Sequence, residues 1–161
     1  MTDLNQDQLQ PHRYSVLFLC PDNAASSTMA EAILRRWGAH EFRAFSGGVK
    51  PAPAIDPQAM AILQLQRVWQ SDFVTKSCTQ FLAADAPRMD FVISLGERPP
   101  AGLPTDWPGG ANLIHWHITD PLTEPNPEHR ELAFHRAFLE LENRIKLLVL
   151  VHQRDATKKA A

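Results

Sequence analysis

The chain has 161 residues, of which 44 % are hydrophobic and 21 % charged, a composition typical of globular proteins. This length predicts one domain, because each half of a two-domain chain would have only a small core. Sixteen Lys and Arg against eighteen Asp and Glu give a net charge of −2, which argues against a nucleic-acid-binding protein. Two cysteines are too few for a disulfide framework and favour a reducing compartment.

The distribution of apolar residues argues against a membrane protein. The longest apolar runs, 16–20 and 147–151, have five residues each, far too few to cross a bilayer. Residues 1–12 are polar and contain no apolar segment of the kind found in signal peptides. We therefore expect a cytoplasmic protein with no membrane partner. Its segments 1–12 and 153–161 are predicted to be mobile tails.

The first elements predicted along the chain are a strand, a tight loop and a helix. Residues 14–20 (YSVLFLC) form an apolar run typical of a strand buried on both faces, and Pro21-Asp22-Asn23 interrupts it. Thr28 and Glu31 have capping-box spacing, which predicts a helix that begins there and ends at Gly38. This layout points loop N–H groups toward an anion at the helix N-terminus.

Strands and helices continue to alternate along the rest of the chain. Strands are predicted at 41–45, 90–95 and 112–118, and helices at 58–67 and 127–152, with a short helix at best at 77–84. Segments 50–57 and 99–110 are rich in proline or glycine and are predicted loops. Together these elements predict a single three-layer α/β domain over residues 1–161. Its four-stranded parallel sheet would have helices on both faces and an anion-binding loop after the first strand.

Chemistry is expected at one edge of this sheet. Cys20, Gly96 and Asp120 each follow a predicted strand, so the topology brings them to the carboxyl edge where ligands bind in open parallel sheets. At the start of a helix, Cys20 would have a lowered pKa and act as a nucleophile. The competing interpretation is a buried, inert thiol.

The segment VLFLCPDNAASSTMAEAIL resembles the signature of low-molecular-weight protein tyrosine phosphatases and the related arsenate reductases. Met29-Ala30-Glu31 match the start of the family's helix, and Asn23 and Ser27 match its loop asparagine and serine. Ser46-Gly47-Gly48 resembles the family's Ser-Ala-Gly, and residues 115–121 (HWHITDP) resemble a stretch that ends in a functional Asp-Pro. The resemblance runs from about residue 14 to residue 151.

The resemblance implies a two-step displacement at phosphorus. Cys20 would attack, Asp120 would protonate the leaving oxygen, and Ser27 would hydrogen-bond the thiolate. Phosphate, arsenate or another small oxyanion would be the ligand. Its binding site would be formed by the loop residues Asp22, Asn23, Ala24, Ala25, Ser26 and Ser27.

Two departures from the family pattern predict weak or lost catalysis. Ser26 stands where the family has an arginine that grips two phosphoryl oxygens, and Asp22 replaces a loop glycine. A carboxylate at position 22 would repel a bound dianion and raise the pKa of Cys20, unless the side chain points away from the binding loop. Arg98 follows the third predicted strand and is a candidate replacement for the arginine, although a solvated loop arginine is the simpler interpretation.

Three functions remain open from the sequence. The first is family chemistry at Cys20 and Asp120, weakened by Ser26. The second is a non-catalytic pseudo-phosphatase that binds an oxyanion or a protein partner, and the third is an arsenate reductase that uses an external thiol. No cofactor is expected. His115 and His117 lie on one face of a strand without a third ligand at motif spacing, so no metal site is predicted.

Overall fold

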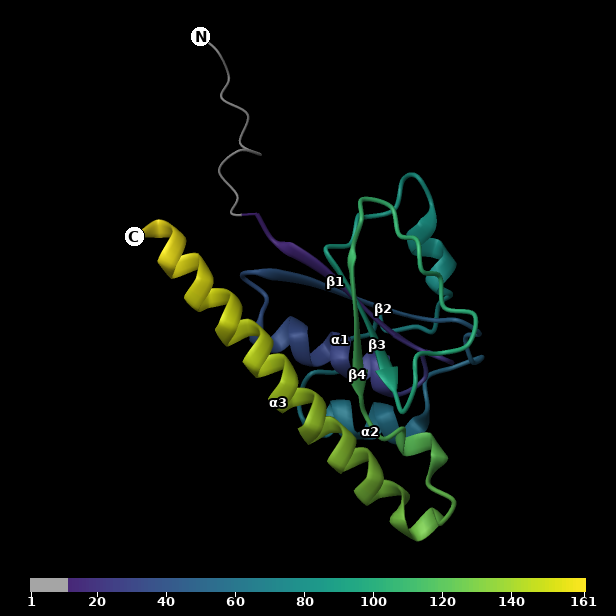
Figure 1. Cartoon of the computed structure of the whole chain (residues 1–161). Coiled ribbons are helices and arrows are strands. Elements are labelled where there is room, and N and C mark those ends of the chain that lie inside the picture. Colours follow the sequence, from purple (N-terminus) through teal and green to yellow (C-terminus); the bar gives the residue numbers. More distant parts are fainter. Residues whose placement is uncertain (1–11) are drawn as a thin grey trace.

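The strand β1 (Tyr14–Cys20) lies inside a four-stranded parallel sheet with the order β2-β1-β3-β4 (Figure 1). The other strands are β2 (Phe42–Gly48), β3 (Phe91–Gly96) and β4 (Asn112–His117). This computed structural model describes residues 12–161. From Ser15 to Cys20 every residue of β1 is buried, as the apolar run predicts for a strand covered on both faces. The predicted single α/β domain with a four-stranded parallel sheet is confirmed.

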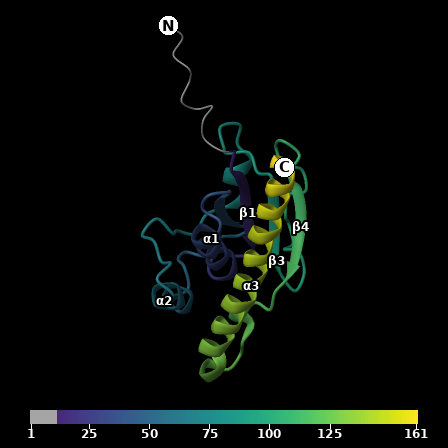
Figure 2. The ribbon, with the colours of Figure 1, turned by 90° about the vertical axis from the view of Figure 1, so that its left-hand side faces the viewer.

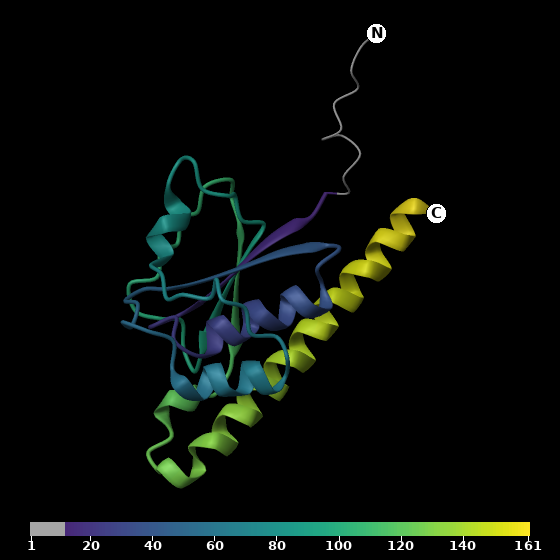
Figure 3. The same cartoon turned by 180° about the vertical axis from the view of Figure 1, so that it is seen from behind.

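The layers on the two faces of the sheet are unequal. Three α-helices, α1 (Ser26–Trp37), α2 (Pro57–Leu65) and α3 (Pro127–Ala160), pack together on one face and enclose the larger core (Figures 2 and 3). On the other face, the helical cover formed by residues 12–161 is limited to the 3₁₀-helix η2 (Cys78–Leu82). There, Trp107 from the loop between β3 and β4 completes a smaller core around Leu17, Leu19 and Val92.

The predicted start of the first helix is wrong by two residues. The helix α1 begins at Ser26, its N-cap Ala25 supplies no side-chain hydrogen bond, and the expected capping box is absent. The Thr28 hydroxyl instead donates to the Asn23 carbonyl at 3.0 Å, and Glu31 pairs with Arg35 at 2.7 Å. Both side chains therefore stabilise the preceding loop and the interior rather than the helix end.

Other element ends also differ from the prediction. The strand β2 continues through Gly48, because its residues pair in register with β1 up to Cys20. The helix α2 includes Pro57 at its first turn, where Asp56 caps it by accepting from the Gln58 N–H at 2.8 Å. It ends at Leu65, before Arg67, which has a left-handed φ of 59°.

The C-terminal prediction needs the largest correction. Residues 153–160, expected to be a mobile tail, continue α3 in an unbroken helix. Alanine, lysine and arginine in this segment are strong helix formers, so the apolar pattern ends before the helix does. Residues 1–11 of the predicted N-terminal tail lie outside the described residues. None of the helices formed by residues 12–161 combines the length and the apolar character needed to traverse a bilayer.

Candidate active site

The loop from Cys20 to Ser26 is held in a tight curve at the carboxyl edge of the sheet. Asn23 at its centre has a left-handed φ of 53°, which asparagine tolerates better than most residues. The loop lies against Gly48, where an added Cβ would come within 2.9 Å of the backbone of both Asp22 and Asn23. Glycine is therefore required at position 48 for the close approach of this loop to β2.

The sulfur of Cys20 lies inside this loop. Its Sγ is 2.9 Å from the Ser27 hydroxyl and accepts a hydrogen bond from the Asn23 N–H at 3.2 Å. The predicted contact between Cys20 and Ser27 is present. Burial nevertheless raises the pKa of the Cys20 thiol to about 11, and the Asp22 carboxylate adds to the rise, while the hydrogen bonds from Ser27 and Asn23 oppose it. Cys20 is therefore a neutral thiol near pH 7, contrary to the lowered pKa predicted from its position.

The Asp22 side chain points back into the loop. Its Oδ1 accepts a hydrogen bond from the Ala24 N–H at 3.1 Å and one from Cys20 Sγ at 3.5 Å. The carboxylate thus occupies the Ala24 N–H on the side of the loop that faces the sulfur. An oxygen of a bound oxyanion would need the same donor. Ala25 lies at the N-cap of α1, where its carbonyl accepts from the Met29 N–H.

Ser26 occupies a buried position at the first residue of α1. Only 5 % of the residue is exposed, and its Oγ has no hydrogen-bond partner among the described residues. A serine hydroxyl here carries no charge and cannot form a two-pronged contact with an oxyanion. Arg98 is exposed and forms no hydrogen bond or ion pair with the loop within residues 12–161. The idea that Arg98 replaces the missing arginine stays a prediction.

Asp120 lies in the same neighbourhood as the loop. It caps the 3₁₀-helix η3 (Pro121–Thr123) by accepting from the Leu122 N–H at 3.0 Å. Burial raises the pKa of Asp120, and the carboxylates of Asp22 and Glu97 raise it further. A raised pKa keeps a carboxyl group protonated to higher pH, as a general acid requires.

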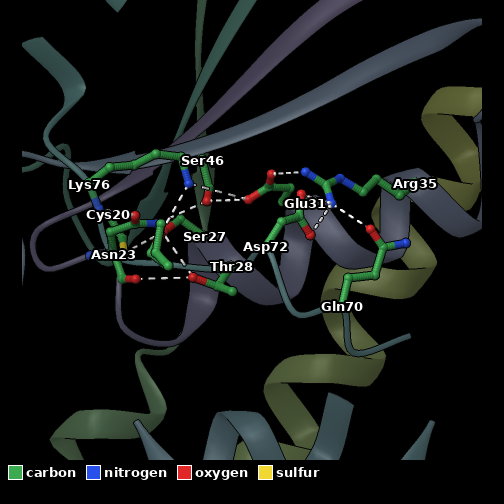
Figure 4. Close-up of polar contacts among 11 residues, drawn as sticks. Cys20, Asn23, Ser27, Thr28, Glu31, Arg35, Ser46, Gln70, Asp72 and Lys76 are labelled. Carbon is green, nitrogen blue, oxygen red and sulfur yellow. Dashed lines mark hydrogen bonds and ion pairs between the residues drawn. The ribbon is translucent and has the colours of Figure 1, made fainter. Parts of the chain in front are cut away.

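A buried polar network supports the loop from behind (Figure 4). The Asn23 side-chain amide donates to Ser27 Oγ at 2.9 Å and to Ser46 Oγ at 3.0 Å, and its oxygen accepts from the Lys76 N–H at 2.9 Å. Ser46 in turn donates to the buried Glu31, which pairs with Arg35. The network fixes the Asn23 conformation and, through Ser27, the position of the sulfur.

Part of this network carries no signal in the sequence. Lys76, whose Nζ lies 3.9 Å from Glu31 and whose N–H contacts Asn23, falls in a segment with no motif. The spacing of Thr28 and Glu31 predicts that Glu31 caps the first helix, whereas its partners lie in this network. An acidic residue in the buried stripe of an amphipathic helix was the available signal, because buried carboxylates require partners.

Cys78 and the two histidines of β4 lie outside the loop that holds the sulfur of Cys20. Cys78 opens η2 and packs in the smaller core, and both cysteines are free thiols. His115 shares a hydrogen bond of 2.8 Å between its Nδ1 and Ser94 Oγ, while His117 is exposed at the end of β4. Neither histidine contacts the loop.

The sequence and fold of this chain match those of a known family. A sequence model of the low molecular weight phosphotyrosine protein phosphatases matches residues 15–159, nearly the whole described chain. The chain belongs to this family. Membership confirms the resemblance seen in the sequence and accounts for the fold, in which a cysteine loop follows the first strand and an Asp-Pro follows the last.

Within this phosphatase family, curated relatives similar to the chain are arsenate reductases. One from Bacillus anthracis (strain CDC 684 / NRRL 3495) is 27 % identical over 135 residues, which cover 84 % of this chain and 93 % of the relative. Another, from Brevibacillus brevis, is also 27 % identical over 135 residues, with the same coverage of 84 % and 93 %.

Solved structures of the family match the whole domain. An arsenate reductase from Archaeoglobus fulgidus is 27 % identical with a TM-score of 0.65, covering 83 % of this chain and 98 % of its own. A thioredoxin-dependent arsenate reductase from Corynebacterium glutamicum is 25 % identical with a TM-score of 0.67, covering 93 % and 67 %. A low molecular weight protein tyrosine phosphatase from T. tengcongensis, 22 % identical with a TM-score of 0.65 over 84 % and 97 %, shares the fold.

Proposed function

We propose that this chain is a phosphatase-family protein in which Cys20-dependent turnover of oxyanion esters is weak or lost. The observation that carries the proposal is the Asp22 carboxylate, which accepts from the Ala24 N–H and from Cys20 Sγ. An internal carboxylate in this place competes with the oxygen of a phosphate or arsenate for the same donors. It also repels the charge of the ligand.

The family reaction requires more than this loop supplies. Cys20 must attack phosphorus as a thiolate while Asp120 protonates the leaving oxygen, after which water, assisted by Asp120, releases phosphate from the phosphocysteine. With a Cys20 pKa of about 11, only about one thiol in 10⁴ is ionised at pH 7. The raised pKa of Asp120 favours its role as the acid of the first step, whereas the raised pKa of Cys20 opposes formation of the thiolate.

The missing arginine adds a second barrier. Loss of an arginine that stabilises a transferring phosphoryl group costs about 10³–10⁵ in rate. The unpartnered hydroxyl of Ser26 gives one uncharged donor where a charged, two-pronged one is needed. The loop therefore favours, at most, slow turnover of small oxyanion esters. The alternative is a non-catalytic domain. The two free cysteines fit a location in the reducing cytoplasm.

A second candidate function is arsenate reduction with an external thiol. The curated relatives named above are arsenate reductases. Two electrons must come from two thiols for each arsenate reduced to arsenite, which leaves a disulfide. Cys78 packs in the smaller core on the opposite face from α1, so the second thiol would come from a small molecule such as glutathione.

The first test is hydrolysis of para-nitrophenyl phosphate between pH 5 and pH 8. We expect the wild-type rate to be close to that of Cys20→Ser, and the double variant Asp22→Gly/Ser26→Arg to exceed it by about 10³-fold or more. Asp85→Gly, which changes an exposed loop acid, is the matched control and should change nothing. Rapid, Cys20-dependent hydrolysis by the wild type would contradict the proposal, and Arg98→Ala would then show whether Arg98 replaces the arginine.

Arsenate with glutathione forms the second arm of the experiment. Arsenite production that needs both glutathione and Cys20 would support the reductase candidate. Equal production by wild type and Cys20→Ser would remove that candidate.

A further inference from the structure

The outward side of α3 carries a row of exposed leucines. Leu132, Leu139, Leu147 and Leu150 are 51–60 % exposed. Together with exposed Arg136 and Asn143 they form the outer stripe of α3, with steps of four, three, four, four and three residues. At 3.6 residues per turn these positions share one side of the helix. This is the spacing by which one helix packs along another.

The outer stripe lies opposite the side of α3 that packs on the domain. The buried residues of the helix follow their own helical spacing and end at Val149 (they are Phe134, Ala137, Phe138, Leu141, Ile145 and Val149). Beyond Val149, half-buried His152 stacks on Tyr14 and Phe42, and Gln153 donates to Glu41. Both sides of one helix therefore carry apolar residues in helical register, but only one side is covered by the described residues.

The last turns of α3 project beyond the rest of the domain. Figure 1 shows the C-terminal end of the helix running past the sheet. From Arg154 to Ala160 every residue is exposed. In one copy these turns are held by helix propensity alone, and they offer a surface on which a second helix can pack.

The charges of α3 are divided between its two halves. Residues 127–142 contain four glutamates and two arginines, a net charge of −2, whereas residues 143–161 contain five Lys or Arg and one aspartate, a net charge of +4. A second copy of the helix running antiparallel would place each acidic half beside a basic half. A parallel copy would place like charges together.

We propose that the outer stripe of α3 binds the same stripe of a second copy of this chain, with the two helices antiparallel. The pairing is centred on Asn143, which faces Asn143 of the second copy across the two-fold axis. Leu139 then packs on Leu147 of the second copy, and the reverse contact repeats this pair. Apart from Arg136 the rest of the seam is leucine, and an Asn pair within it fixes the register of the two helices.

Charged residues beside the seam complement each other in this register. Glu140, which pairs with Arg144 of its own helix, lies on the same flank as Arg144 of the second copy. Glu142, which pairs with Lys146 of its own helix, lies on the opposite flank beside Lys146 of the second copy. The two-fold axis repeats both pairs. The projecting turns from Arg154 to Ala160 pack against the first turns of the second helix. This dimer is independent of the function proposed for Cys20.

The mass in solution tests the interface. Light scattering after gel filtration of the full chain at tens of micromolar should give twice the 18.1 kDa mass of one chain. Leu139→Glu should give the monomer mass, because a carboxylate would enter the centre of the seam. Leu65→Glu is the matched control at an exposed leucine of α2 and should stay dimeric. A wild-type monomer, or a dimer that survives Leu139→Glu, overturns the proposal.

Cross-linking tests the direction of the helices. Under mild oxidation, Asn143→Cys should form a covalent dimer. In the antiparallel pair, position 143 is the one position of the outer stripe that faces the same position of the second copy. Arg136→Cys should not form this dimer, because it faces Leu150 of the second copy. The native Cys20 and Cys78 are buried and serve as internal controls in both variants. Equal cross-linking at both positions would show a parallel pair and overturn the antiparallel assignment.

Discussion

At Cys20, the environment opposes the thiolate that cysteine chemistry requires. The position at the start of a helix, the Ser27 hydroxyl and the Asn23 N–H all favour the charged form. Burial and the Asp22 carboxylate outweigh them, and the pKa rises to about 11. Asp22 therefore both occupies the loop and adds to the rise in the Cys20 pKa that burial causes.

Alkylation of Cys20 by iodoacetamide should report this balance. Because only the thiolate reacts, the rate should rise about tenfold per pH unit and continue to rise past pH 9. Asp22→Asn removes the charge but keeps the shape, so it should lower the pKa of Cys20 and speed alkylation at pH 8. Mass spectrometry of the labelled peptides measures both thiols, and Asp106→Asn is the exposed control. A wild-type rate that levels off below pH 8 would show a reactive thiolate.

At the scale of elements, the strand, loop and helix around Cys20 were predictable because their signals are local. An apolar run, the breakers Pro21 to Asn23 and a helical repeat each act within a few residues. The residues that hold the loop are not local: Ser46 and Lys76 are 23 and 53 positions from Asn23. Glu31 likewise accepts from Ser46, 15 positions away, instead of forming the expected capping box.

The direction of the Asp22 side chain was likewise beyond the sequence. The sequence has a charged residue where the family has a loop glycine. A single χ angle decides whether that charge points into the loop or away from it. The structure turns it inward, toward the Ala24 N–H. Residue types and spacing thus predict which side chains surround a ligand site, whereas the conformation of a single loop residue decides whether the site is open.

Substitution of Asn23 should separate the two roles of this residue. Asn23→Gly keeps the left-handed φ of 53° accessible but removes the side-chain hydrogen bonds, and we expect a loss of about 2–4 kcal/mol in the free energy of unfolding. Asn23→Ala should lose about 1 kcal/mol more, because a Cβ disfavours that φ. Urea unfolding followed by tryptophan fluorescence measures both, with the exposed Asn112→Ala as control. Equal losses in the two variants would show that backbone conformation contributes nothing.

At the scale of the whole molecule, the hydrophobic cores on the two sides of the sheet differ in size. The face covered by α1, α2 and α3 has a large core, whereas the opposite core depends on η2 and on a loop of prolines and glycines. The helical spacing of five apolar residues predicts the buried side of α3, and all but the last are buried (they are Phe134, Phe138, Leu141, Ile145 and Leu148). The same spacing does not explain the exposed leucines of α3, because they lie on the side of the helix that faces away from the core.

The thin side of the sheet should be sensitive to the loss of one aromatic ring. Trp107 is 4 % exposed and donates through Nε1 to the Pro104 carbonyl at 2.9 Å, so it ties the loop to the smaller core. We expect Trp107→Ala to lower the free energy of unfolding by about 3–5 kcal/mol, through lost burial and the cavity left behind. Trp37→Ala is the matched control: its ring is 41 % exposed at the end of α1, and its loss should cost about 1 kcal/mol or less. Urea unfolding monitored by circular dichroism compares the two, and equal losses would mean that the loop does not hold this face of the sheet.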